Sequence, residues 1–371
     1  MLVMMHLGKA AGAALEELVP RFGMSIVSVL DAFTSTTIEL AVAAFALRKG
    51  LIKVVQAAML GAILNNLLLV MGIAITVGGV YNHQQQLKKE TTQTAINILM
   101  LCTIAYVIPV ALDYSLVNIH KQHLPTFTNS TDILKQRVEI QTLVDKDILA
   151  LSKVMAIIML IVYLCCLLYQ YHSRTFMVTP EQKHEGPHTV ERRYTHFWFA
   201  GLAFVAAMAA QIYSANLLVH AVETLGRQFH LNDSFVGFIL LPIVLVADLQ
   251  EEVIAIRESR ANRLDKCVSL MVGSCMQIAL LVTPLLVLMG WIMDQPMTFR
   301  FTVMEVVILV GSVLIINYMI SDNETNWLEG LLLLAVYLLC AIAFYYDMSS
   351  KETLPGEGNT ISGEGTAGGG H

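Results

Sequence analysis

Charged residues are scarce in this chain, and their scarcity excludes most classes of soluble protein. Asp, Glu, Lys and Arg make up 14% of the 371 residues, whereas hydrophobic residues make up 56%. Soluble domains carry about 25% charged residues. The composition, with a mean hydropathy of +0.64, therefore predicts an all-α polytopic membrane protein. The formal net charge is −6, and without a basic excess we expect no nucleic-acid partner.

Cysteine patterns and catalytic motifs are also missing. The six cysteines have neither metal-ligand spacing nor the pattern of a disulfide framework, and we interpret them as small core residues. We find no nucleophile–base pair and no metal triad, so we expect neither an enzyme nor a resident cofactor. The segment Met1–Pro20 lacks the basic start and compact apolar run of a signal peptide, and we expect a marginal helix there.

Long apolar stretches dominate the chain instead. A helix needs about 20 mostly apolar residues to cross a bilayer. Two stretches of that length, 24–47 and 235–256, carry acidic residues. The other candidate spans are 54–80, 95–117, 149–170, 197–220, 267–293, 301–320 and 327–346. We therefore expect nine membrane spans in addition to the marginal first helix.

Two of the acidic residues mark an internal repeat. We call the number of sequence positions between Glu39 and Glu251 the repeat offset. The same number of positions separates further pairs of polar or small residues. These pairs are Thr36 and Asp248, Gly61 and Gly273, and Asn65 and Gln277. Four expected spans separate the two acidic stretches, so the stretches run antiparallel in the membrane. An inverted-topology repeat of this kind places the ion site of many secondary transporters at the repeat interface.

The repeat divides the chain into two membrane halves of five helices each. The N-terminal half covers 1–171 and the C-terminal half covers 196–348. A linker of mixed charge, 172–195, joins the halves. The Gly-rich segment 349–371 cannot bury a core, and we expect it to be disordered.

The paired glutamates indicate ion binding. An ionised carboxylate at mid-membrane costs about 2.5–3.5 kcal/mol, so such residues usually have a function. Thr36 and Glu39 share one helix face because they are three residues apart, and Asp248 and Glu252 lie close to Glu251. Hydroxyl and carboxylate oxygens are the ligands that Ca²⁺ prefers.

A proton can compete with a cation for the same carboxylates. A low dielectric favours the neutral form of a carboxyl group, and a bound cation favours the ionised form. This competition, combined with alternating access, predicts antiport. Three amide residues in apolar helices, Asn65, Asn66 and Gln277, fit either the ligand shell of the ion or hydrogen bonds between helices.

At these residues the sequence resembles the cation/proton exchanger (CAX) family of the calcium/cation antiporter superfamily. The family motif Gly-Asn-Ala-Thr-Glu-Leu corresponds to Ser35–Leu40. Its second motif, Gly-Asn-Ala-Ala-Glu-His, corresponds to Ala247–Glu252. The segments Gly273–Leu280 and Asn326–Gly330 are close family matches. Both Gly-Asn pairs are replaced here, and Glu252 stands where the family has His.

The resemblance implies an exchanger of Ca²⁺ for H⁺ in a vacuolar or other organellar membrane. Glu39 and Glu251 would bind the metal ion and the proton in turn. The further site residues would be Thr36, Asp248, Glu252, Ser35, Asn65, Asn66, Ser274 and Gln277. The family's first helix would be missing, and its second would be degraded in Met1–Pro20.

The replaced motif residues leave two alternatives open. One is a monovalent exchanger of the same fold that moves Na⁺ or K⁺ against protons. The other is a transport-inactive membrane scaffold. In each case we expect membrane lipid around the chain, and homo-oligomers are possible. For the exchangers, the transported cation and the proton are the remaining partners.

Overall fold

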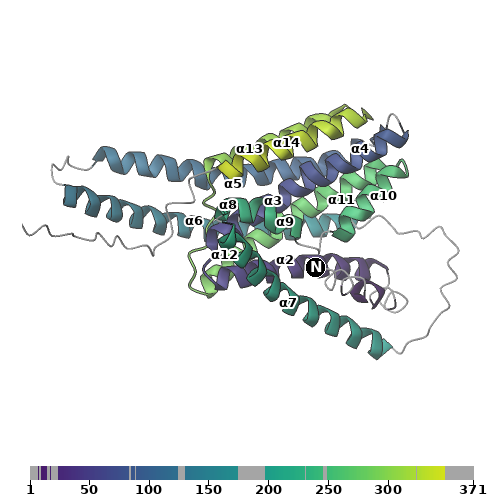
Figure 1. Ribbon diagram of the computed structural model, residues 1–371, viewed down its shortest axis with the longest axis horizontal. Helices are drawn as coiled ribbons and strands as arrows, with labels where there is room; N and C mark the ends of the chain where they lie inside the picture. Colours follow the sequence, from purple (N-terminus) through teal and green to yellow (C-terminus); the bar gives the residue numbers. More distant parts are fainter. Residues whose placement is uncertain are drawn as a thin grey trace, which may run out of the picture.

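The fold is almost entirely helical (Figure 1). The computed structural model describes residues 7, 10–14, 17, 24–82, 85–87, 89–123, 130–173, 197–229, 231–244, 249–322 and 324–346. Within these residues, two-residue strands β1 (Gln85–Gln86) and β2 (Glu324–Thr325) form an antiparallel pair. Most of the predicted first helix, most of the linker and all of the predicted disordered tail lie outside this part of the chain.

The predicted spans are confirmed as long apolar helices. Among the described residues, seven helices are long and apolar enough to cross a membrane. They are Ile52–Asn82, Ile96–Leu116, Leu143–Tyr169, Phe199–Gly226, Leu264–Ile292, Val303–Ser321 and Trp327–Tyr346. Each coincides with one of the predicted spans other than 24–47 and 235–256, because a run of about 20 apolar residues has few alternatives to a membrane helix.

Three of the complete helices extend beyond these apolar windows, namely α5 (Lys89–His123), α6 (Ser130–Ser173) and α7 (Phe197–Gln228). Helices α13 (Val303–Ser321) and α14 (Trp327–Tyr346) coincide with their windows. The helix over 52–82 consists of α3 (Ile52–Leu64), the π-helical segment η1 (Asn65–Val70) and α4 (Met71–Asn82). The helix over 264–292 consists of α11 (Leu264–Gln277), the π-helical segment η3 (Ile278–Val282) and α12 (Thr283–Ile292).

The two acidic stretches take different forms. The first is the continuous helix α2 (Met24–Arg48). The second begins with α8 (Asp233–Phe235), η2 (Val236–Leu240) and α9 (Leu241–Val244). It continues as α10 (Leu249–Arg260), which extends past the end of the predicted span. Residues 245–248, between α9 and α10, lie outside the described part of the chain.

The backbone repeats at the same offset that relates Glu39 to Glu251. Helix α3 begins at Ile52, and α11 begins at its counterpart Leu264. The turns before them contain Gly50 (φ 77°) and its counterpart Asn262 (φ 59°), which both adopt the left-handed conformation that Gly and Asn tolerate best. Segments η1 and η3 also end at equivalent residues. These coincidences match the predicted repeat in the backbone itself.

Close helix contacts establish the relative direction of the halves. A Cβ atom at Gly61 would overlap the carbonyl oxygen of Phe238, and one at Gly78 would overlap the side chain of Ser259. The helix over 52–82 therefore runs in the same direction as the stretch from α8 to α10. Since the turn at Gly50 reverses the chain between α2 and α3, the second acidic stretch runs opposite to α2. This is the inverted topology that the sequence predicts.

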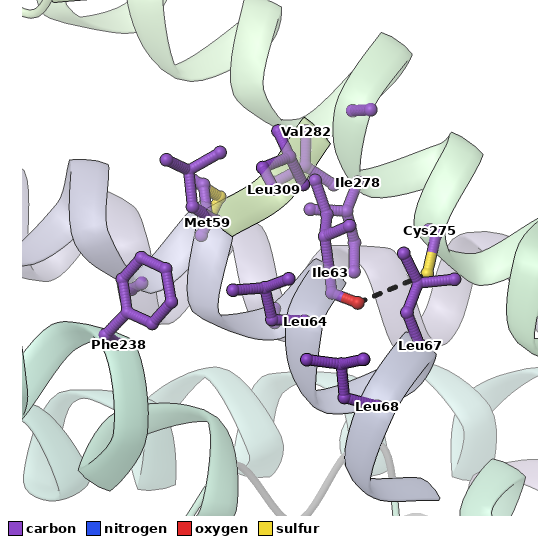
Figure 2. Packing of buried hydrophobic residues seen from close by; sticks show 14 of the residues in the cluster. Met59, Ile63, Leu64, Leu67, Leu68, Phe238, Cys275, Ile278, Val282 and Leu309 are labelled. Carbon is purple, nitrogen blue, oxygen red and sulfur yellow. Dashed lines mark hydrogen bonds between the residues drawn. The ribbon is translucent and has the colours of Figure 1, made fainter. Parts of the chain in front are cut away.

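The two interrupted helices form the centre of the bundle. The span Ile52–Asn82 is 89% buried and Leu264–Ile292 is 67% buried, whereas the other spans range from 22% to 44%. Figure 2 shows their contact, with Ile63 and Leu67 beside Cys275 and with Phe238 on the opposite side of the helix. Large apolar side chains on α6, α7 and α14 are exposed, as expected for helices that face lipid.

Candidate functional site

The first acidic motif lies inside the bundle. Thr36 and Glu39 on α2 are each only 5% exposed. The Nε2 of Gln277, on α11, donates a hydrogen bond to the Thr36 hydroxyl. Glu39 lies one turn further along the same helix, and the residue has an interaction within the protein as well. The carboxylate of Glu39 is therefore not directed into lipid.

The second acidic motif is reached by an amide of the first half. Asn65, at the start of η1, is 1% exposed. Its Nδ2 donates to Oε1 of Glu252 on α10 over 3.1 Å. Glu252 itself is half-buried. This hydrogen bond places a carboxylate of the second half against the π-helical segment of the first half.

A third polar pair lies where the two central helices cross. The Nδ2 of Asn66 donates to Oγ of Ser274 over 3.1 Å, and Asn66 is 2% exposed. The adjacent Cys275 Sγ donates to the carbonyl oxygen of Ile63 over 3.5 Å (Figure 2). The polar residues thus sit in the middle of an otherwise apolar contact.

The hydrogen bonds of the two halves are reciprocal. Asn65 and Gln277 are separated by the repeat offset, so they occupy equivalent places in the two halves. Asn65 of the first half contacts the acidic motif of the second half, and Gln277 of the second half contacts that of the first. The amides therefore hold the two motifs to the central helix crossing. The sequence allowed these amide residues either to bind the ion or to form hydrogen bonds between helices. The geometry shows that they form the hydrogen bonds.

Part of the predicted site lies outside the described residues. Asp248 belongs to residues 245–248 and is not described. Ser35 and Glu251 are helical, but their side chains lie outside the description. Among the described side chains, no group of three or more His, Cys, Asp or Glu comes together. The oxygen donors brought together here come instead from Glu39, Glu252, Thr36 and the amide residues.

Two backbone carbonyl oxygens of η3 accept hydrogen bonds from side chains. The Tyr106 hydroxyl donates to the carbonyl oxygen of Ala279 over 3.0 Å. The Thr283 hydroxyl donates to that of Ile278 over 2.9 Å. A π-helical turn widens the helix and disturbs its regular hydrogen bonds, and these two side chains satisfy carbonyl oxygens there. Tyr106 and Thr283 therefore stabilise the widened turn of η3.

Two tyrosines near the site have no distinguishing sequence signal. Tyr106 on α5 supports η3 as described. Tyr337 on α14 is 4% exposed, and its hydroxyl has no hydrogen-bond partner among the described residues. Each lies in a long apolar helix that carries further tyrosines, where a buried aromatic residue usually serves packing. Only the three-dimensional arrangement reveals the hydrogen bond of Tyr106 and the buried hydroxyl of Tyr337.

Comparison with known proteins gives one family. The family model described as "Sodium/calcium exchanger protein" matches residues 9–172 and 199–346. The chain is 34% identical over 351 residues to a vacuolar calcium ion transporter of Schizosaccharomyces pombe, covering 93% of this chain and 78% of the relative. It is 32% identical over 356 residues to a Ca²⁺/H⁺ antiporter of Aphanothece halophytica, covering 93% and 88%.

Solved structures of similar fold agree with this result. Native YfkE aligns with a TM-score of 0.66 and 26% identity, covering 92% of this chain and 89% of that protein. The H⁺/Ca²⁺ exchanger CAX aligns with a TM-score of 0.63 over 93% of this chain and 83% of the exchanger. At 14% identity the second likeness shows the fold alone.

Proposed function

The chain belongs to the sodium/calcium exchanger protein family, and we propose that it exchanges Ca²⁺ for H⁺ across a vacuolar or other organellar membrane. The similar relatives include proteins named as vacuolar calcium ion transporters, Ca²⁺/H⁺ antiporters and vacuolar cation/proton exchangers. The observation that carries the proposal is the reciprocal hydrogen bonding at the helix crossing, which joins the acidic motif of each half to the other half.

The exchange follows from two properties of the site. Glu39 is a buried carboxylate, and Glu251 is its counterpart in the repeat. A divalent cation compensates two carboxylates, and protons neutralise the same two groups when the cation leaves. The site is therefore occupied either by Ca²⁺ or by protons. Opening to one side of the membrane in each state gives antiport by alternating access.

The other residues complete the ligand shell. Thr36 and Ser274 supply hydroxyl oxygens, and Asn65, Asn66 and Gln277 supply amide oxygens while their N–H groups bond across helices. Ser35 and Asp248 complete the set from outside the described side chains. Ca²⁺ takes six to eight oxygen ligands in flexible geometry, which a shell of hydroxyl, amide and carboxylate oxygens provides.

Two alternatives receive less support. The replaced Gly-Asn pairs are consistent with a monovalent exchanger or a transport-inactive scaffold. However, relatives that align with this chain over most of their own length are named for Ca²⁺ transport or for cation/proton exchange. We therefore retain Ca²⁺ as the substrate.

The test uses the full chain in sealed vesicles with an imposed pH gradient. We expect proton-driven uptake of ⁴⁵Ca²⁺ by the wild type and background uptake by Glu39→Gln and Glu251→Gln. Glu305→Gln is the matched control, because Glu305 is also a buried glutamate, 4% exposed, but caps helix α13 through Thr302. This control should keep its uptake per folded molecule.

Two results would contradict the proposal. One is equal uptake by the wild type and both glutamine variants at the paired positions. The other is a pH gradient that Na⁺ or K⁺ dissipates while Ca²⁺ does not. The second result would establish the monovalent exchanger, and no specific flux with any of these cations would favour the scaffold.

A further inference from the structure

One carboxylate at the helix crossing has no acidic counterpart in the repeat. Glu252 lies on α10, and the equivalent position in the first half is Leu40. Among the described residues Glu252 forms no salt bridge. The basic residues Arg257 and Arg260 of the same helix are exposed. Arg260 instead stacks over the ring of Tyr81 at 4.5 Å. The negative charge of Glu252 is therefore balanced by no basic group in the described part of the bundle.

Two buried polar atoms on elements that surround Glu252 have no hydrogen-bond partner in the described part of the chain. The first is Oδ1 of Asn65, whose Nδ2 donates to Glu252 over 3.1 Å. The second is the hydroxyl of Tyr337 on α14, a helix that packs against η1. Both residues are more than nine-tenths buried. An unpartnered buried polar group costs about 1–3 kcal/mol, so the free Oδ1 of an amide that is already bonded to the Glu252 carboxylate points to a ligand at this place.

The chemistry of these groups selects the class of ligand. A carboxylate, an amide carbonyl and a phenol all present oxygen, which hard cations prefer to nitrogen or sulfur. Helices α10 and α14 both pack against η1, the segment that begins with Asn65. The three oxygens come from α10, η1 and α14, so a cation held by them would join elements of both halves.

We propose that Glu252, Asn65 and Tyr337 form an accessory cation subsite next to the paired glutamates, and that Glu252 strengthens selection of divalent over monovalent cations. The inference rests on the proposed cation exchange and assigns its specificity. Coulomb attraction to a carboxylate is twice as large for a divalent ion as for a monovalent one at the same distance. Loss of the Glu252 charge therefore weakens Ca²⁺ binding more than Na⁺ or K⁺ binding.

The test measures equilibrium binding of ⁴⁵Ca²⁺ to the purified full chain, with Na⁺, K⁺ and Mn²⁺ as competitors. We expect Glu252→Gln to raise the Kd for Ca²⁺ about tenfold, a loss of about 1.4 kcal/mol. The monovalent ions should then compete better relative to Ca²⁺. Tyr337→Phe removes only a neutral oxygen, and we expect a rise in Kd of about threefold.

A control on the same helix separates a local effect from a change in net charge. Glu258 lies further along α10, with its Oε2 3.8 Å from Nη1 of Arg263. Glu258→Gln removes the same charge from the same helix, and we expect its Ca²⁺ affinity to stay within about twofold of the wild type. Glu252→His introduces the residue of the resembled motif, and it should behave like Glu252→Gln.

The outcomes distinguish this inference from the proposed function. Wild-type affinity and wild-type competition in both Glu252→Gln and Tyr337→Phe would overturn the subsite, whatever the flux experiments show. Absence of Ca²⁺ binding by the wild type would overturn it as well. Subsite-dependent binding without proton-driven uptake would instead refute the proposed exchange and leave the subsite standing. If Glu252→Gln does not fold, Tyr337→Phe, which keeps the aromatic ring, decides.

Discussion

The interrupted central helix of each half, 52–82 and 264–292, has the same backbone plan, whereas the side chains packed against its end differ. Gly78 of the first half lies against Gln85, and Gly290, its counterpart in the second half, lies against Met297. Gln85 and Met297 are themselves counterparts in the repeat. We call the end of each helix a corner of the repeat. The corner at Gly78 therefore contains a polar residue, and the equivalent corner at Gly290 contains an apolar one.

The polar corner is fixed by directional bonds. The Ser259 hydroxyl donates to the carbonyl oxygen of Ala74 over 2.7 Å, and Gln85 Nε2 donates to the Ser259 carbonyl over 2.6 Å. Both side chains are fully buried. The counterpart of Ser259 is Leu47, which is also fully buried. Hydrogen bonds require one geometry, whereas apolar packing is non-directional, so the two ends of the repeat resist displacement differently.

The same contrast appears at the ion site. Leu40 and Glu252 occupy equivalent positions, and only the second carries charge. The lesson is that the repeat preserves the backbone framework while the two halves have separate polar chemistry. Symmetry predicts where a residue lies, and the residue type has to be read at each position separately.

Leu40→Glu would break this comparison most strongly. It gives the first half the charge of the second, but in a place packed against the apolar core. We expect a loss of about 2.5–3.5 kcal/mol, the cost of a charge at mid-membrane. Thermal unfolding followed by size-exclusion chromatography in detergent measures it, with Leu40→Met as the control. A stable Leu40→Glu protein would show that the asymmetry is not required for folding.

Gly61→Ala would disturb the shared framework. The added Cβ meets the Phe238 backbone, which cannot move without shifting η2. We expect a loss of about 1–3 kcal/mol from overpacking. Gly311→Ala is the matched control, since a Cβ at Gly311 has no neighbour within 4 Å. Alanine there should stabilise helix α13 by up to about 1 kcal/mol. Equal unfolding temperatures of the two variants would contradict the close helix contact.

Ser259→Ala would make the polar corner more like its apolar counterpart. It removes the hydrogen bond to Ala74 and leaves Gln85 with one partner fewer. We expect a loss of about 1 kcal/mol and faster amide hydrogen exchange around β1. Ser321→Ala serves as the control, because the hydroxyl of Ser321 donates within its own helix, to the carbonyl oxygen of Asn317. Unchanged exchange in Ser259→Ala would refute the assignment of directional bonds to this corner.

The sequence predicted the framework well because its signals are long or repeated. Runs of about 20 apolar residues locate the spans, and the offset between the paired glutamates locates the repeat. The polar extensions of α5 and α6 were not predicted, since hydropathy falls where these helices continue. The π-helical segments were also missed, because Asn65–Val70 and Ile278–Val282 contain no residue that requires a widened turn.

The candidate site was predicted as a set of residues but not as a set of contacts. Asn66 and Ser274 were both named, yet their bond joins residues 208 positions apart and depends on the helix crossing. The bond between Asn65 and Glu252 spans 187 positions. Tyr337 was missed because a tyrosine in an apolar helix is usually a packing residue. Partner choice across such distances is fixed by packing, which one sequence does not display.

Ile63 and Cys275 are each other's counterparts in the repeat, and they touch. A contact between equivalent residues lies on the axis that relates the halves. If the two halves exchange conformations during transport, each contact away from this axis is replaced by its symmetry equivalent. The contact between Ile63 and Cys275 is its own equivalent and stays in place. We therefore expect the contact between Ile63 and Cys275 to act as a pivot, which moves least when the bundle changes the side to which it opens.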